Sequence, residues 1–132
     1  MTRFQSTAEV ENHFLPFFQD LMADPVLGPK FASLDVAFRV DYTEPEASFR
    51  FDTTVDPPVV TSGDQARTQD STVVLSMTSD SGHKFWLGDL NLVMALGLKK
   101  VKATGDVNRL LRLLPAMKPS YAKYREYALN AA

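Results

Sequence analysis

The stretch GDLNLVMALGLKKVKATGD, which runs from Gly88 to Asp106, joins an apolar segment to a basic one. Residues 90–96 are apolar almost all round, and Lys99, Lys100 and Lys102 follow before a Gly-Asp pair closes the stretch. We expect a helix over the apolar part and a strand over the lysines. A helix with so little polar surface either lies inside the core or lines a cavity for an apolar guest.

Upstream of this stretch, alternating residues predict strands. Apolar and polar side chains alternate with a period of two in 35–42 and again in 47–53, and the four residues 43–46 connect them as a hairpin. A short strand is expected over 59–61, at an edge because two prolines precede it. A fourth is expected over 71–77, which is rich in β-branched residues. The lysine segment makes five.

Capping signals predict helices on both sides of these strands. Ser6 and Glu9 form a capping box in front of an apolar stripe. Pro16 falls within that stripe and lacks an amide hydrogen, so we expect a kink or a break there. A second helix is expected after the β-rich segment, with Ser79 or Asp80 as its N-cap.

A last helix is expected after Asp106, which would cap it. Its apolar residues form one stripe, whereas Pro115 and Pro119 are expected to bend or end it, leaving 120–132 as a short tail. The elements then follow in the order helix, four strands, helix, strand, helix. This order predicts an α+β fold, in which a five-stranded, mostly antiparallel sheet is covered on one face by helices.

Composition narrows the function classes. The chain has 132 residues, which fits one domain over 1–132, and its net charge of −2 does not favour nucleic acid as a partner. It has no cysteine, which excludes disulfides and thiolate metal sites. We find no metal-ligand spacing, phosphate loop or nucleophile motif, so no cofactor, metal or catalytic residue is assigned. With no secretory signal or membrane-spanning run, a cytoplasmic location is expected.

The second half of the chain resembles the sterol carrier protein type 2 family of lipid-transfer domains. An ordered set of segments carries the resemblance: the Val-rich strand 71–77, the capped helix with Asp80, Phe85, Trp86 and Gly88, the apolar helix 90–96, the basic strand with Lys100, Val101 and Lys102, the Gly105-Asp106 turn, and LLRLLP at 110–115. The resemblance implies a five-stranded sheet covered by helices, with an apolar tunnel between them for fatty acids, acyl-CoA thioesters, sterols or other lipids.

Apolar and aromatic residues of the segments that would line this tunnel are the candidate ligand-binding residues. An acyl chain could be held by burial of apolar surface alone, and Met suits walls that adapt to irregular guests. The candidates are Phe38, Phe49, Phe51, Met77, Phe85, Trp86, Leu90, Val93, Met94, Leu110, Leu114, Met117 and Tyr121. Of the adjacent Phe85 and Trp86, we expect one to face the guest and the other to pack between helix and sheet.

The first hypothesis is therefore non-enzymatic binding or transfer of a hydrophobic ligand. The last helix and the tail would act as a lid that bends at its prolines. Lys99, Lys100 and Lys102 are expected to be a solvated strand edge, and they leave open an attraction to an anionic group or a transient membrane contact. The identity of the ligand and the oligomeric state stay open.

Two alternatives come from the same residues. One is a small α+β cone enzyme of the isomerase or cyclase kind, for which a buried His or carboxylate would supply proton transfer. His13, Asp41 and Asp52 are its candidates. The other is an accessory domain that dimerises through an apolar face.

Overall fold

The computed structural model describes residues 3–130, without the side chains of Leu110, Leu113 and Ala116. Helices and strands follow each other in an α+β order, as the sequence predicts. The elements are α1 (Thr7–Ala23), α2 (Leu27–Ala32), β1 (Ala37–Thr43), β2 (Ala47–Asp52), β3 (Val59–Ser62), α3 (Asp64–Arg67), β4 (Val73–Thr78), α4 (Ser79–Leu87), α5 (Leu92–Gly97), β5 (Lys102–Gly105) and α6 (Val107–Asn130).

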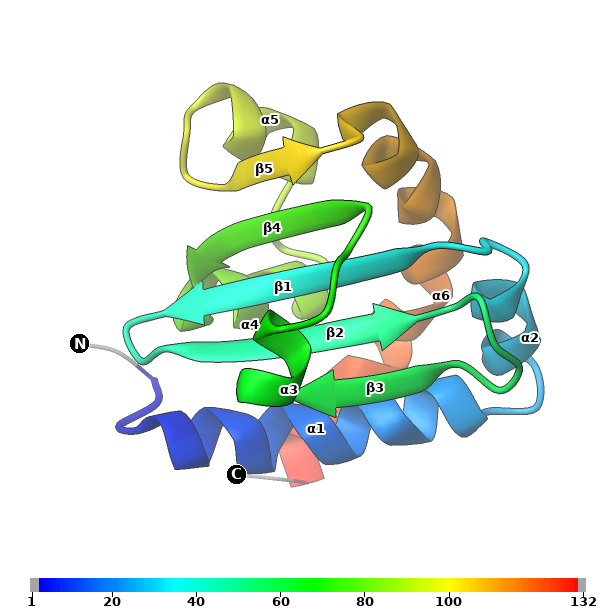
Figure 1. The fold of residues 1–132 in the computed structure, drawn as a ribbon. Helices are drawn as coiled ribbons and strands as arrows, with labels where there is room; N and C mark the ends of the chain where they lie inside the picture. The colour runs from blue at the N-terminus through cyan, green and yellow to red at the C-terminus, as the bar shows by residue number, and fades with distance from the viewer. Residues whose placement is uncertain (1–2, 131–132) are drawn as a thin grey trace.

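One open five-stranded sheet organises the molecule, with the strand order β3-β2-β1-β4-β5 (Figure 1). Three of its four pairings are antiparallel, and β1 and β4 are parallel. The expected mostly antiparallel sheet is therefore confirmed. Helices α4 and α6 lie behind the sheet in Figure 1, α1 runs along β3, and the short α3 lies in front.

The alternation of side chains in the central hairpin separates a core face from a polar face. Phe38, facing Phe51, and Val40, facing Phe49, are buried on the helix side. On the other side, Arg39 lies opposite Arg50 in the register. Each arginine forms a salt bridge with the aspartate two residues along its own strand, and this compensates its positive charge. This face is polar and half-buried, and the apolar core lies under the helices.

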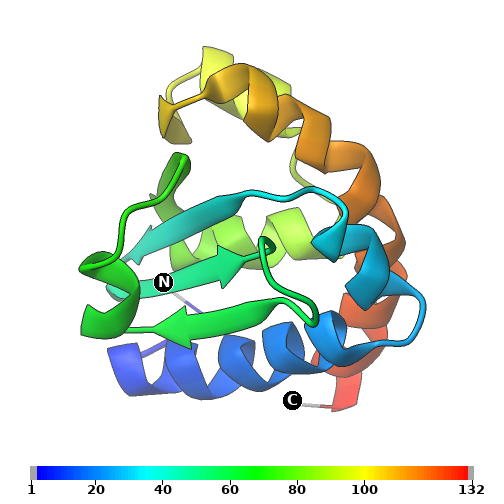
Figure 2. The ribbon, with the colours of Figure 1, turned by 45° about the vertical axis from the view of Figure 1, so that its right-hand side comes forward.

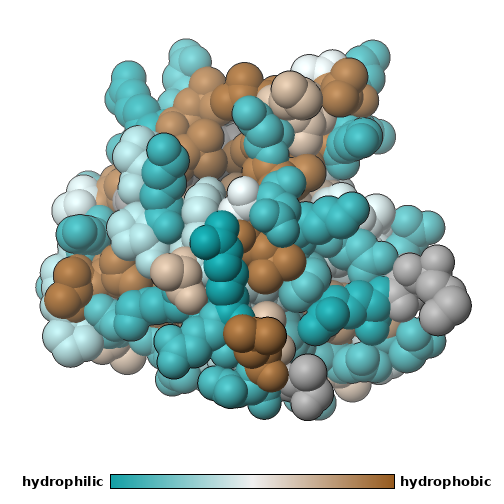
Figure 3. Space-filling view, turned by 180° about the vertical axis from the view of Figure 1, so that it is seen from behind, coloured by the Kyte–Doolittle hydropathy of each residue, from teal (hydrophilic) through white to brown (hydrophobic). Residues whose placement is uncertain are grey.

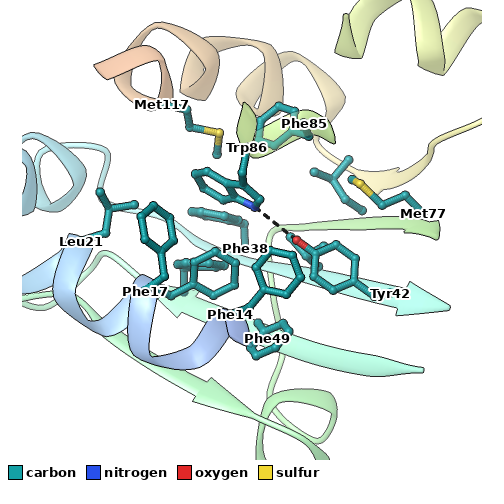
Figure 4. Packing of buried hydrophobic residues seen from close by; sticks show 14 of the residues in the cluster. Phe14, Phe17, Leu21, Phe38, Tyr42, Phe49, Met77, Phe85, Trp86 and Met117 are labelled. Atoms are coloured by element: carbon teal, nitrogen blue, oxygen red, sulfur yellow. Dashed lines mark hydrogen bonds between the residues drawn. The ribbon is translucent and has the colours of Figure 1, made fainter. Parts of the chain in front are cut away.

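Aromatic side chains fill the core between α1, α4 and the sheet (Figure 4). The ring of Phe18 lies 5.2 Å from that of Trp86 and 4.8 Å from that of Phe51. The indole Nε1 of Trp86 donates a hydrogen bond to the hydroxyl of Tyr42, at 3.2 Å. A buried Trp and a buried Tyr each satisfy their polar atom in this way. Aromatic rings therefore make up much of the centre of the molecule.

Three helix predictions need correction. Helix α1 continues through Pro16, which is exposed, so water can reach the carbonyl of Asn12 that the proline leaves without a partner. The N-cap of α4 is Thr78, whose hydroxyl accepts a hydrogen bond from the amide of Ser81. The expected order of elements also lacks the short helix α2, which residues 27–32 form.

Helix α6 is longer than expected. Asp106 caps it, as the sequence predicts, through a 3.1 Å hydrogen bond that its carboxylate accepts from the amide of Arg109. Pro115 and Pro119 do not end the helix, which runs on to Asn130. Figure 2 shows that it bends on the way. Residues 120–130 are therefore no tail; they contribute Tyr124, which is 0% exposed, to the core.

Candidate functional site

A hollow with a mixed apolar and polar lining lies where α4, the following loop, α5 and α6 meet, and we call it the α4–α6 groove. Its volume is about 400 Å³ and it is partly open to solvent. Ligand pockets typically measure about 300–1,000 Å³. Its walls are Phe85, Gly88, Asp89, Leu90, Asn91, Leu92, Val93, Leu114, Lys118 and Tyr121.

Gly88 shapes one end of this groove. It ends α4 with a φ of +84°, a conformation that glycine adopts without strain. A Cβ atom on this residue would lie 2.8 Å from Nη2 of Arg125 and 3.2 Å from Cδ2 of Tyr121. The same arginine donates a hydrogen bond from its Nε to the carbonyl of Leu87, at 2.7 Å. Close approach of α6 to the end of α4 therefore depends on a glycine.

Two aromatic rings form the floor of the groove. Phe85 is 5% exposed, and its ring meets that of Tyr121 edge to face with 5.7 Å between centroids. Burial raises the pKa of the Tyr121 hydroxyl, which therefore stays neutral at physiological pH. On the other side of Phe85, the ring of Trp86 lies 5.2 Å away. A guest that touches Phe85 would thus disturb the surroundings of the tryptophan.

The walls of the groove combine buried and open apolar residues. Leu92 is buried, Leu90 and Leu114 are half-buried, and Val93 is 58% exposed. Asn91 orients this wall, because its side chain caps α5 by accepting a hydrogen bond from the amide of Met94, at 3.0 Å. Helix α5 therefore begins at Leu92 and not at Leu90. Leu92 and Ala95 of this helix are buried in the core, and Val93 lines the groove. That the helix lines a cavity for a guest stays a prediction.

The structure brings five of the candidate residues to this groove: Phe85, Leu90, Val93, Leu114 and Tyr121. Six others lie in the core, each 5% exposed or less: Phe38, Phe49, Phe51, Met77, Trp86 and Met117. Met94 is on the surface next to the groove, with an exposed fraction of 62%. The side chain of Leu110 lies outside the described part of the chain. The enclosed tunnel stays a prediction, since the hollow found here is an open groove.

Polar residues of the groove were not among the candidates. Asp89 and Asn91 belong to the loop between two helices, and Lys118 stands one turn before Tyr121 on α6. The hypothesis of an apolar ligand led us to select apolar residues as candidates. It therefore did not include the polar residues at the rim of the groove. The spacing of Lys118, Tyr121 and Leu114 on a single helix is the signal that could have found the lysine.

A second hollow of about 320 Å³ separates α1 from α6, and it differs in chemistry. Four of its eight lining residues are charged. Lys123 of α6 bridges it with a 2.8 Å ion pair to Asp24, which follows α1. This hydrogen bond lowers the pKa of Asp24 to about 2. We take the α4–α6 groove as the candidate site because five of the candidate residues line it.

The candidates for an enzyme are not brought together. Asp41 and Asp52 lie on the polar face of the sheet, paired with arginines. His13 lies on the opposite side, where its Nε2 is 2.7 Å from the hydroxyl of Tyr124. That hydroxyl is also 2.7 Å from Nδ1 of His83. The open sheet is not the cone on which this alternative relied.

Burial controls the protonation of the two histidines. It lowers the pKa of His13 to about 4, with smaller contributions from His83 and Arg3, and it also lowers the pKa of His83. Neutral rings suit the shared hydroxyl of Tyr124, which can donate to one ring nitrogen while it accepts from the N–H of the other. Within residues 3–130, no group of three His, Asp or Glu side chains could hold a metal ion.

The fold is similar to that of several proteins of known structure. The sequence matches no protein-family model and no curated protein. Among solved structures, it is similar to apo sterol carrier protein 2 from Yarrowia lipolytica (TM-score 0.66, 16% identity, covering 82% of this chain and 89% of that one). Its TM-score is the same, 0.66, with sterol carrier protein domain 2 of Helicoverpa armigera. That match has 13% identity and covers 86% of this chain and 88% of that one.

A third similar structure belongs to a much longer protein. It is a double mutant of the sec-alkylsulfatase PisA1, with a TM-score of 0.60 and 16% identity; the match covers 76% of this chain but only 15% of that one. Among residues 3–130, no helix has the length and apolar character needed to cross a bilayer. From the sheet order, the helical layer and these matches, we conclude that this chain has the fold of the sterol carrier protein 2 domains.

Proposed function

We propose that the protein binds a hydrophobic small molecule, such as a fatty acid or another lipid, in the α4–α6 groove and transfers it without chemical change. The observation that carries this proposal is the groove itself, a partly apolar hollow on a fold shared with sterol carrier proteins. Its floor is aromatic, and its walls combine leucine and valine with Asp89, Asn91 and Lys118. Burying apolar area stabilises a bound chain by about 25 cal/mol per Å², without a specific polar contact.

The rim offers a partner for an acidic headgroup. The side chain of Lys118 is exposed beside the apolar walls, and it can pair with a carboxylate while the chain lies on Phe85 and Leu114. An exposed ion pair contributes only about 0.2–1 kcal/mol, so the headgroup would select among ligands and the chain would supply the affinity.

Palmitate titration tests the proposal. We expect palmitate to change the fluorescence of Trp86, the only tryptophan, because its ring contacts the groove residue Phe85. Native mass spectrometry should show one palmitate per chain. The groove variant Val93→Asp should weaken binding at least tenfold, because it places a carboxylate on the apolar wall.

Val26→Asp is the matched control, since Val26 is also a valine with a similar exposed fraction, 63% against 58%, and lies outside the groove. It should bind palmitate like the wild type. If Val93→Asp and Val26→Asp bind palmitate with equal affinity, the palmitate site is not in this groove. A wild-type protein that binds neither palmitate nor cholesterol would overturn the proposed function.

A further inference from the structure

Large apolar side chains are exposed at the end of the molecule that carries the α4–α6 groove. This end consists of α5, β5 and the first half of α6, residues 92–118, and we call it the basic tip. Its exposed apolar residues are Val93 (58%), Met94 (62%), Leu98 (62%), Val107 (39%) and Leu111 (36%). Exposed apolar groups gathered in one region mark a surface that meets a partner or a membrane.

Charge is concentrated at the same end. Residues 92–118 contain six basic residues and a single acidic one, Asp106, and therefore carry +5. Because the whole chain carries −2, the other residues carry −7. The basic residues are all exposed: Lys99, Lys100, Lys102, Arg109, Arg112 and Lys118. An acidic protein therefore has one strongly positive end.

The apolar and basic groups interleave on this end. Seen from behind, hydrophobic side chains gather at the top of the molecule, over α5 and the start of α6, with hydrophilic ones projecting around them (Figure 3). A further hollow of about 400 Å³ lies here, and its lining mixes Leu96, Val101 and Val107 with Lys99 and Lys102. The α4–α6 groove includes Val93 and Lys118 of the same end. The mouth of the groove and the basic tip therefore share one surface.

We propose that the basic tip docks onto an anionic lipid bilayer. Val93, Met94 and Leu98 enter the boundary between headgroups and acyl chains, while the lysines and arginines meet the negative headgroups. A basic residue near an anionic membrane contributes about 1 kcal/mol. The −7 carried by the rest of the molecule turns that part away from the membrane, so the charge separation also orients the protein.

Docking in this orientation would present the groove to the bilayer. This consequence rests on the proposed function, because it assumes that the groove takes a lipid. The docking itself depends only on the exposed apolar side chains and the charge of the tip.

Flotation with phosphatidylcholine vesicles, with and without an equimolar share of phosphatidylglycerol, tests the docking. The wild-type protein should float with the anionic vesicles and not with the neutral ones, and added salt should weaken binding. Lys100→Gln together with Lys102→Gln should weaken it about 30-fold, at about fivefold per lysine. Met94→Glu together with Leu98→Glu should abolish it.

Matched double variants control for charge and for apolar exposure. Lys30→Gln with Lys84→Gln removes two exposed lysines outside the tip, and Val26→Glu with Leu129→Glu alters two apolar residues that are 63% and 80% exposed. Both should bind anionic vesicles like the wild type. Equal losses in tip and control variants would overturn the proposal, as would flotation that depends on neither anionic lipid nor the tip.

Palmitate binding without vesicles separates this inference from the proposed function. Lys100 and Lys102 do not line the α4–α6 groove, so their double variant should keep its palmitate affinity while it loses vesicle binding. A wild-type protein that binds palmitate but no anionic vesicle would overturn the docking and leave the function standing. Tip-dependent flotation of a wild-type protein that binds neither palmitate nor cholesterol would support the docking and overturn the function.

Discussion

At the scale of single residues, the hydroxyl of Tyr124 occupies an unusual position. It is fully buried, and a histidine nitrogen lies 2.7 Å away on each of two sides, from α1 and from α4. The ring of Phe4 packs against both histidines, with centroid distances of 5.1 Å to His13 and 6.3 Å to His83. One polar atom therefore ties three helices together, and it does so with histidines that are neutral.

This arrangement predicts a loss of stability in mild acid. His13 has a pKa of about 4 in the folded protein and an ordinary value of 6.5 in the unfolded chain. Between these values the unfolded chain binds the extra proton, so stability is complete above pH 6.5 and falls as the pH drops toward 4. Solvent screening of the half-buried ring limits the loss to about 1–2 kcal/mol.

Urea unfolding at pH 7.0, 5.5 and 4.5 measures this loss. His13→Gln cannot take up the proton, so its stability should depend less steeply on pH over the same interval. The carboxylates are common to both proteins and cancel in the comparison. Parallel pH profiles for the two proteins would show that His13 does not titrate as its burial requires.

At the scale of helices and strands, the joint between α4 and α6 decides the shape of the groove. Gly88 supplies both the left-handed turn and the space for Arg125 and Tyr121. Gly97, the last residue of α5, has open space around the position of a Cβ atom and a φ in the ordinary range. The two glycines therefore form a natural pair for comparison.

Gly88→Ala should destabilise the fold by about 1–3 kcal/mol, because it forces a Cβ into a left-handed conformation and against the arginine. Gly97→Ala should be neutral or should stabilise by up to about 1 kcal/mol, as alanine does in a helix. Chemical denaturation of both variants measures the difference. An equal effect at the two positions would contradict the role given to Gly88.

Most elements, but few of their contacts, follow from local sequence. Alternation in 35–42 and 47–53 predicts the hairpin because each strand has one buried face. The parallel pairing of β1 with β4 joins residues more than 30 positions apart, and no local pattern encodes it. Proline shows a related limit, because tertiary packing keeps helices intact through it. Helix α1 continues through Pro16, and α6 bends but does not end at Pro115 or Pro119.

The candidate site shows the same limit. Phe38 and Phe85 are both apolar, so the sequence makes both of them candidates. In the structure, Phe38 is buried in the core, whereas Phe85 forms part of the floor of the groove. Which of two apolar residues faces a hollow depends on the path of α6, and that path is fixed by contacts between distant parts of the chain. Sequence therefore selects the residue types, and packing assigns their places.

At the scale of the whole molecule, the core and the basic tip differ in how many contacts hold them in place. Strand β1 lies between two partners and is covered by helices, whereas α5 is anchored by only two buried side chains, Leu92 and Ala95. Strand β5 has a single neighbour in the sheet. Local stability should therefore decrease from the centre toward the tip.

Amide hydrogen exchange should reveal this gradient. We expect protection to be greatest in β1 and β2 and least in α5 and β5, because local opening of the tip exposes little apolar surface. Anionic vesicles should raise protection in α5 and leave β1 unchanged. Uniform protection from β1 to α5 would show that the tip opens only with the whole fold.

The contact between α1 and α6 has a consequence for how the protein is made. His13 and Tyr124 are 111 residues apart. Phe14 stacks on the same tyrosine, and Phe17 meets it edge to face. During synthesis, the first helix emerges long before its partner and has no complete core to join. The nascent chain must hold these rings open to solvent, or to a chaperone, until the last helix has left the ribosome.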